Sequence, residues 1–203
     1  GISLGSNVVI ANYIGQNDTK RIPRVVHTAV SLALLSGVFL LILGQFVAHP
    51  ILLLMGAPKD IIHLATLYLR IYFLGMPFFM LYNYGAAILR AIGDTKRPLI
   101  FLIISGIANA ALNMILVILF HMGVAGVAIG TIISQLISCV LVLTCLYRSE
   151  GSYQLRFSKL KINGAYMEQI FQVGVPAGIQ STVINLSNAL LQSSVNSFGS
   201  IAM

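Results

Sequence analysis

Residues 89–99 read LRAIGDTKRPL, and this stretch determines how the chain around it folds. It holds four charged residues, although only 8% of the 203 residues in the chain are charged. Long apolar segments lie on both sides of it. Gly93 and Asp94 are typical of a tight turn, and Pro98 suits the first turn of a helix. The stretch therefore predicts a charged turn that joins two long apolar helices.

The composition of the chain predicts that these helices lie in a membrane. Hydrophobic residues make up 58% of the sequence and the mean hydropathy is +0.92, whereas soluble domains are usually about half apolar. Runs long enough to cross about 30 Å of hydrocarbon recur along the chain. They are residues 28–48, 67–89, 99–120, 124–147 and 170–195. Together with an apolar segment at residues 1–14, they predict an all-α membrane protein, a polytopic transmembrane helix bundle of about six spans.

The two ends of the sequence predict a fragment of a longer protein. The first apolar segment begins at Gly1 without a preceding charged region, and it would span only about 21 Å as a helix. Met203 follows the last predicted span without a polar tail. We therefore expect a chain that is truncated at both ends.

The basic residues of the chain are confined to particular loops. The net charge is +7 and the pI is near 9.7, which in a soluble domain would suggest nucleic-acid binding. Ten of the twelve basic residues, however, fall in alternate loops between the predicted spans. They are Lys20, Arg21 and Arg24, then Arg90, Lys96 and Arg97, and then Arg148, Arg156, Lys159 and Lys161. Because basic loops mark the cytoplasmic side, we expect a multi-pass plasma-membrane protein that contacts the lipid bilayer and no nucleic acid.

Polar side chains form stripes along two of the predicted spans. The first stripe is Ser105, Asn109 and Asn113, and the second is Ser181, Asn185, Asn188 and Gln192, with Gln180 beside it. Spacings of three and four residues place each stripe on one helix face. Polar groups in hydrocarbon are expensive, so these faces must avoid lipid. Two interpretations remain open: the stripes line a water-filled cavity, or they join neighbouring helices by hydrogen bonds.

The span at residues 67–89 carries a face of aromatic and thioether groups. This face consists of Tyr72, Met76, Phe79, Met80 and Asn83. Such side chains form adaptable surfaces for varied apolar ligands. Ordinary helix packing explains the same pattern, so both interpretations stay open.

Small residues and prolines mark places where the helices bend or approach each other. Pro77 and Pro176 each remove a backbone donor within a predicted span, and each should kink its helix. We interpret them as candidate hinges or static bends. Gly126, Gly130 and Ser134 recur every four residues, which predicts a close approach of two helix backbones.

The sequence does not predict catalytic or metal-binding chemistry. Nucleophilic catalysis needs an activated side chain beside a base, and no acid or histidine lies at mid-membrane depth. The histidines at 49, 63 and 121 lack the close spacing of zinc ligands. Cys139 and Cys145 are six residues apart on one predicted helix, so they cannot pair with each other. We expect a protein that is not an enzyme and that holds no metal or cofactor.

Further motifs extend the opening stretch in both directions along the chain. They are ANYIGQNDTKRIPRVV at 11–26, PILLLMGAPKDIIHLATLYLRIYFLGMPF at 50–78, ILRAIGDTKRPL at 88–99, GVAGVAIGTIISQ at 123–135 and GVPAGIQ at 174–180. In order and spacing, these motifs closely resemble the multidrug and toxic compound extrusion (MATE) family of efflux transporters. The likeness covers nearly the whole chain.

The resemblance implies most of one transporter lobe and the start of another. Residues 1–147 would be helices two to six of the amino-terminal lobe, residues 148–166 the cytoplasmic linker between lobes, and residues 167–203 the first helix of the carboxy-terminal lobe. The rest of that lobe is then an expected partner. The family implies a secondary active antiporter that exports cationic or amphiphilic organic compounds in exchange for H⁺ or Na⁺ by alternating access.

The binding residues of the family carry over only in part. Asn113 matches its helix-five asparagine, and Asn109 lies one turn earlier. Val117 and Ile184 stand where many members have an aspartate or a glutamate, and helix one with its aspartate is not in this chain. Glu168 should lie at the cytoplasmic interface, so the coupling ion is left open.

We therefore predict a substrate cavity lined by several of the spans. Its residues are Asn109, Asn113, Tyr72, Asn83, Gln180, Asn185 and Asn188. A flippase for lipid-linked saccharides is an alternative with the same broad architecture, but such proteins tend to have charged cavities, and these spans hold no central Arg or Lys. A non-transporting membrane scaffold is a second alternative, which would need a larger partner-binding domain than these loops provide.

Overall fold

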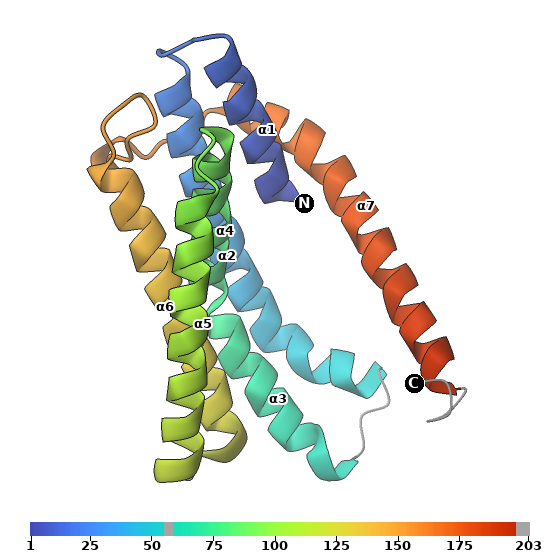
Figure 1. Ribbon diagram of the computed structural model, residues 1–203. Helices are drawn as coiled ribbons and strands as arrows, with labels where there is room; N and C mark the ends of the chain where they lie inside the picture. The colour runs from blue at the N-terminus through green and yellow to red at the C-terminus, as the bar shows by residue number, and fades with distance from the viewer. Residues whose placement is uncertain (55–58, 198–203) are drawn as a thin grey trace.

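The protein is built from helices. The computed structural model describes residues 1–54 and 59–197 (Figure 1). The α-helices are α1 (Ile2–Gly15), α2 (Ile22–Leu54), α3 (Lys59–Leu74), α4 (Met76–Ala91), α5 (Lys96–Met114), α6 (Gly123–Arg148) and α7 (Gly164–Ser197). A π-helical turn (Ile115–Leu119) follows α5, and a 3₁₀ turn (Phe157–Lys159) precedes α7. Within the described ranges there is no β-strand, which confirms the predicted all-α class.

Helix α4 lies at the centre of the bundle and organises its core. It packs against α1, α2 and α6, and α5 packs on α6. Tyr84, Ile88 and Leu89 of α4 are fully buried in a cluster with side chains of the neighbouring helices, including Ile10 of α1 and Leu146 of α6. The core therefore lies near the end of the bundle where the stretch 89–99 makes its turn.

The lengths of the helices fit a membrane protein. In the described part of the chain, three helices are long and apolar enough to cross a membrane: α2, α5 with its π-helical turn, and α6. Helices α3 and α4 add a fourth span if the bent pair counts as one. The other two predicted spans are α1, with 14 residues, and α7, with 34 residues. Helix α7 is long enough to cross a membrane, but its polar side chains make it less apolar than α2, α5 and α6.

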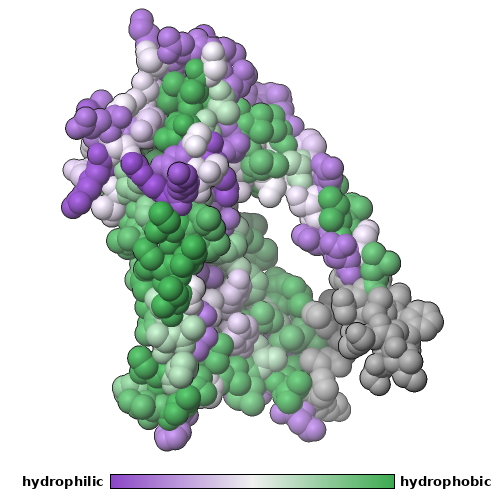
Figure 2. Space-filling model, in the orientation of Figure 1, coloured by the Kyte–Doolittle hydropathy of each residue, from purple (hydrophilic) through white to green (hydrophobic). Residues whose placement is uncertain are grey.

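The three groups of basic residues lie at one end of the molecule. The α1–α2, α4–α5 and α6–α7 connections meet at this end, while α2 and α5 finish at the other (Figure 1). We call it the basic end. Figure 2 shows hydrophilic residues gathered there and hydrophobic residues over the middle of the bundle. This arrangement confirms the predicted alternation of the chain between two ends.

A bend divides the predicted span at residues 67–89. Helices α3 and α4 are bent by 47° relative to each other, with Gly75 between them. Pro77 has no N–H to donate, so the helix loses one hydrogen bond to the preceding turn and can bend here. The Gly75 N–H instead bonds the carbonyl oxygen of Tyr72 over 3.0 Å and closes a tight turn. The predicted kink near Pro77 is therefore present, and its role as a hinge stays a prediction.

Two other prolines lie inside continuous helices. Helix α2 runs through Pro50 to Leu54, beyond the apolar run at residues 28–48. Helix α7 begins at Gly164 and runs through Pro176, so the kink and the hinge predicted at Pro176 stay predictions. A proline removes a single donor, and residues after it still donate to carbonyls one turn back. The apolar run of α2 thus marks only part of the helix.

Helices α1 and α7 touch through glycine residues. A Cβ atom on Gly5 would overlap the carbonyl oxygen of Ile170 and would lie 2.7 Å from the backbone nitrogen of Gly174. A Cβ atom on Gly174 would lie 2.8 Å from the Cα atom of Ile2. Backbone atoms cannot rotate away as side chains can, so this approach requires glycine.

Replacing Gly5 with alanine should destabilise the protein, although alanine is the better helix former. The added methyl group must push α7 away from α1, and overpacking of this kind costs about 1 to 3 kcal/mol. Thermal unfolding of the full-length protein in detergent measures the effect. Gly106→Ala is the matched control, because Gly106 lies within α5 with open space around it. Equal unfolding temperatures for the two variants would contradict the close contact.

Candidate functional site

The first polar stripe joins α5 to α6. Asn109 Nδ2 donates to Ser134 Oγ over 3.3 Å and to Thr131 Oγ1 over 3.4 Å. Asn109 Oδ1 accepts from Asn113 Nδ2 over 3.2 Å. Thr131 and Ser134 donate in turn to carbonyl oxygens of their own helix. The amides of α5 are therefore half-buried members of a hydrogen-bonded network between two helices, as the second interpretation of the stripe expects.

The amide of Asn113 fits into a notch in α6. A Cβ atom on Gly130 would overlap the Oδ1 atom of Asn113. Because Gly130 has no side chain, this oxygen can approach the backbone of α6. Gly126 faces Leu116 in the same way, with a distance of 3.2 Å between a built Cβ and the leucine Cβ. The close approach predicted from the small residues of α6 is confirmed. Asn113 Oδ1 is buried and has no hydrogen-bond partner among the described residues, whereas most buried polar atoms are paired.

The backbone changes its geometry directly after this stripe. Ile115–Leu119 is π-helical, and the Phe120 N–H bonds the carbonyl oxygen of Ile115 over 3.2 Å. Turns of this kind are rare and occur frequently at functional sites. Val117, which stands where many members of the resembling family have an acidic residue, lies within this π-helical turn. An irregular apolar turn thus follows the amides in this chain.

Tyr72 and Asn83 lie on the bent pair of helices, one on each side of the bend. The ring of Tyr72 is half-buried and stacks on Tyr68, with 6.2 Å between the ring centroids. Asn83 Nδ2 donates to the carbonyl oxygen of Phe79 over 2.8 Å, within its own helix. The two residues are therefore not joined to the amide network of α5 by any hydrogen bond between described residues.

The predicted residues of α7 lie apart from those of α5. Gln180, Asn185 and Asn188 are exposed, and α7 packs on α1 and α2 (Figure 1). Gln192, the last member of the second stripe, lies outside the residues whose side chains are described. The structure thus brings Asn109 and Asn113 together but leaves the predicted residues of α7 without contact to them. Their shared cavity stays a prediction.

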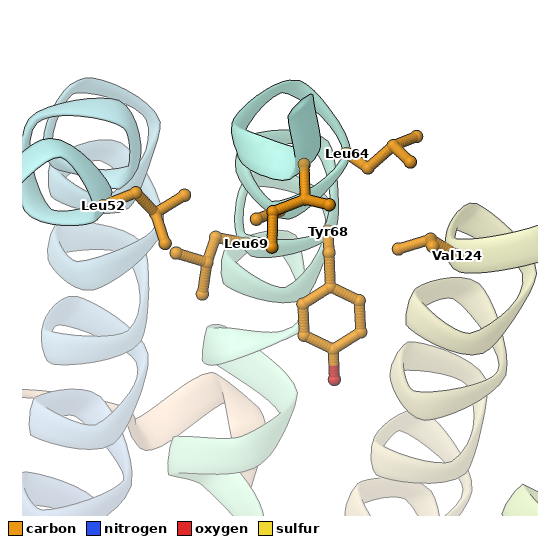
Figure 3. A pocket seen from close by; sticks show the side chains of 7 residues that line it. Leu52, Leu64, Tyr68, Leu69 and Val124 are labelled. Carbon is orange, nitrogen blue, oxygen red and sulfur yellow. The ribbon is translucent and has the colours of Figure 1, made fainter. Parts of the chain in front are cut away.

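An apolar cavity of about 510 Å³ lies near the end of the bundle opposite the basic end. It is lined by Leu52, Ile61, Leu64, Ala65, Tyr68, Leu69 and Val124. In Figure 3, Leu52 and Leu69 point toward each other, and Leu64 and Val124 approach from neighbouring helices. The stacked ring of Tyr68 connects this cavity to Tyr72. Its size and lining suit an apolar ligand or part of one.

The sequence did not predict the apolar cavity or the hydroxyl partners of Asn109. Tyr68 lies one turn before Tyr72, and the spacing of four residues could have placed it on the same face. Thr131 had no signal of its own, because a single threonine on an apolar helix is common. Ser134 was recognised only as a small residue, although its hydroxyl also binds the amide of Asn109.

Comparison with known proteins identifies the class and the family. The fold is that of polytopic membrane transporters. The chain is similar to the outward-facing conformation of a multidrug resistance MATE family transporter of the MOP superfamily, with a TM-score of 0.87 and 23% sequence identity. The match covers 98% of this chain and 44% of that one. An inward-facing conformation of such a transporter gives a TM-score of 0.80 at 24% identity, with coverage of 87% and 40%. The sequence model of the MatE family matches residues 1–115. The chain therefore belongs to the MatE family.

Curated relatives match along the entire chain. The probable multidrug resistance protein YoeA of Bacillus subtilis is 34% identical over 100% of this chain and 45% of its own length. The multidrug export protein MepA of Staphylococcus saprophyticus is 24% identical over 98% of this chain and 44% of its own length. The chain thus spans a little under half the length of these relatives.

The contact between Asn109 and Ser134 should contribute measurably to stability. A double-mutant cycle of Asn109→Ala and Ser134→Ala isolates the pair, and we expect a coupling free energy of about 0.6 kcal/mol, as is typical of hydrogen bonds between membrane helices. Reversible unfolding of the full-length protein in detergent gives the four free energies. Strictly additive effects would show that the two side chains do not interact.

Proposed function

We propose that the full-length protein is a secondary active antiporter that exports cationic or amphiphilic organic compounds in exchange for H⁺ or Na⁺. Membership of the MatE family supports a transporter. The names of relatives that cover the whole chain, a probable multidrug resistance protein and a multidrug export protein, support drug-like cargo. The apolar helices place the protein in a bilayer, and its basic end suits the cytoplasmic side of the plasma membrane.

One observation carries this proposal: sheltered amides and an apolar, aromatic cavity occur in the same bundle. If the Asn109 and Asn113 side chains turned out of the contact between α5 and α6, their amide oxygens would replace part of the water around a cation. The rings of Tyr68 and Tyr72 can contact a charged group in the cavity, which is worth about 0.5 to 2 kcal/mol per ring. Apolar parts of the compound fit the cavity beside Tyr68. A lipophilic cation needs both kinds of contact.

The exposed polar face of α7 supplies the second side of the proposed cavity. Gln180, Asn185 and Asn188 lie on a helix that leaves the bundle (Figure 1). A polar face of this kind must avoid lipid, and the remaining helices of a second lobe would enclose it. Alternating access then follows from the two lobes opening to either side of the membrane.

Adding a lipophilic cation should collapse an imposed ion gradient in everted membrane vesicles that contain the full-length protein. Export of the compound would be coupled to ion flow in the opposite direction, so a fluorescent reporter of the gradient recovers on addition. Vesicles without the protein provide the control. Gradients that stay unchanged under both H⁺ and Na⁺ conditions would contradict antiport.

Replacing the cavity amides with leucine should impair export without preventing membrane insertion. Asn113→Leu and Asn185→Leu each remove a polar contact to a charged ligand, which corresponds to a loss of about tenfold or more in transport. Drug resistance of cells that produce each variant measures the effect, with the amount of protein in the membrane determined in parallel. Asn12→Leu is the control, because Asn12 is exposed at the end of α1 and bonds only to Gln16 among the described residues. Unchanged resistance in the first two variants would show that these stripes are structural.

A further inference from the structure

The segment between α6 and α7 is docked onto the bundle. Leu155 is fully buried, and its N–H bonds the carbonyl oxygen of Leu146 over 3.1 Å. Tyr153 and Leu160 pack against the same core. Phe157 stacks on Tyr147 with 6.0 Å between ring centroids. Residues 149–163 therefore do not behave as a loose tether between two lobes.

Two adjacent side chains at the start of α2 bind the backbone of this segment. The first is His27, which is only 5% exposed. Its Nε2 atom accepts from the backbone N–H of Arg156 over 3.1 Å, and its Nδ1 atom lies within hydrogen-bond distance of the carbonyl oxygen of Pro23. Since Nε2 accepts, the proton of the neutral ring is on Nδ1, and both ring nitrogens are then paired.

The second side chain is Thr28, which is fully buried. Its hydroxyl donates to the carbonyl oxygen of Arg24 over 2.8 Å and accepts from the backbone N–H of Asn163 over 3.3 Å. Asn163 in turn caps α7: its Oδ1 accepts from the N–H of Ala165 over 3.1 Å, and its carbonyl oxygen accepts from the N–H of Met167 over 2.9 Å. Thr28 thus connects α2 to the first turn of α7 through one residue.

Electrostatics cannot account for this docking. Most charged groups around the contact are basic: Arg24 lies on α2, and the segment carries Arg156, Lys159 and Lys161 with one acid, Glu150. The ion pairs between described residues join Asp18 to Arg21 and Asp94 to Arg97, both outside the segment. Like charges repel, so the burial of Leu155 and the bonds to His27 and Thr28 must hold the segment in place.

We propose that His27 and Thr28 are positioning residues that clamp the inter-lobe linker and so fix where α7 begins. Helix α7 is then held at two points: at its start by the clamp, and further along by the glycine contact with α1. A helix held in this way transmits the position of the first lobe to the second. The role of the clamp in transport rests on the function proposed above, whereas the docking itself does not.

Hydrogen exchange of backbone amides in the full-length protein tests the docking residue by residue. In the wild type, the amides of Arg156 and Asn163 should be protected. Thr28→Val removes the acceptor for Asn163 and should accelerate its exchange by about fivefold or more. His27→Phe keeps a buried ring without ring nitrogens and should do the same for Arg156. Each substitution should affect its own partner more than the other amide, which a general loss of packing would not do.

Matched variants complete the exchange experiment. Thr28→Ser keeps the hydroxyl and should restore protection of Asn163. Thr66→Val is the control for the substitution itself. Thr66 lies on α3, and its hydroxyl donates to the carbonyl oxygen of Ile62, one turn back, over 2.7 Å. This substitution should leave both linker amides unchanged. Unprotected linker amides in the wild type, or exchange rates that Thr28→Val does not alter, would overturn the clamp.

Transport kinetics test whether the clamp positions the lobes. Thr28→Val should lower the maximal rate of export by about fivefold with KM unchanged, because the clamp lies at the basic end, away from the proposed cavity. Thr28→Ser should restore the rate. A normal rate in a variant whose Asn163 amide exchanges freely would overturn the positioning role. A wild type without transport would instead count against the proposed function, and the exchange result would still decide the docking.

Discussion

The rest of the structure depends on the need to shelter polar groups from hydrocarbon. Lipid offers no hydrogen bonds, so the backbone forms helices and the amides of α5 turn toward α6. Asn109 meets this requirement through Thr131 and Ser134, and Asn113 meets it only in part, since its oxygen finds no partner among the described residues. The same constraint leaves the polar face of α7 in need of enclosure by further helices.

The molecule has a tightly packed end and a more open one. Fully buried core residues such as Ile10, Ile88 and Leu146 lie toward the basic end, where the linker is also docked. The apolar cavity beside Tyr68 and the exposed amides of α7 lie toward the other end. A transporter needs a firm frame for its moving parts, and the packing of α4 with the docked linker provides one. The bend at Gly75 separates the two regions within a single predicted span.

The sequence predicted the features that depend on local chemistry. Apolar runs gave the helices, the basic clusters gave the alternation of the loops, and Pro77 gave the bend. It did not predict that α2 continues past Pro50, because one lost hydrogen bond is tolerated when the following turn keeps its own. Nor did it predict the bonds of Asn109 to Thr131 or of Thr28 to Asn163, which join residues far apart in the chain. The register of packed helices decides such contacts, and no single segment encodes it.

Cysteine accessibility tests the central claim, that amide-bearing faces of α5 and α7 reach water within the membrane. In a full-length protein whose Cys139 and Cys145 are replaced by serine, single cysteines at Asn109, Asn113, Ser181 and Asn185 are treated with a charged, membrane-impermeant thiol reagent. Ile107, an apolar residue of α5 that is 67% exposed on the bundle surface, provides the lipid-facing comparison. We predict that the amide positions react in at least one conformation of the transport cycle while position 107 stays unlabelled. Labelling of none of the amide positions in any conformation would contradict the account.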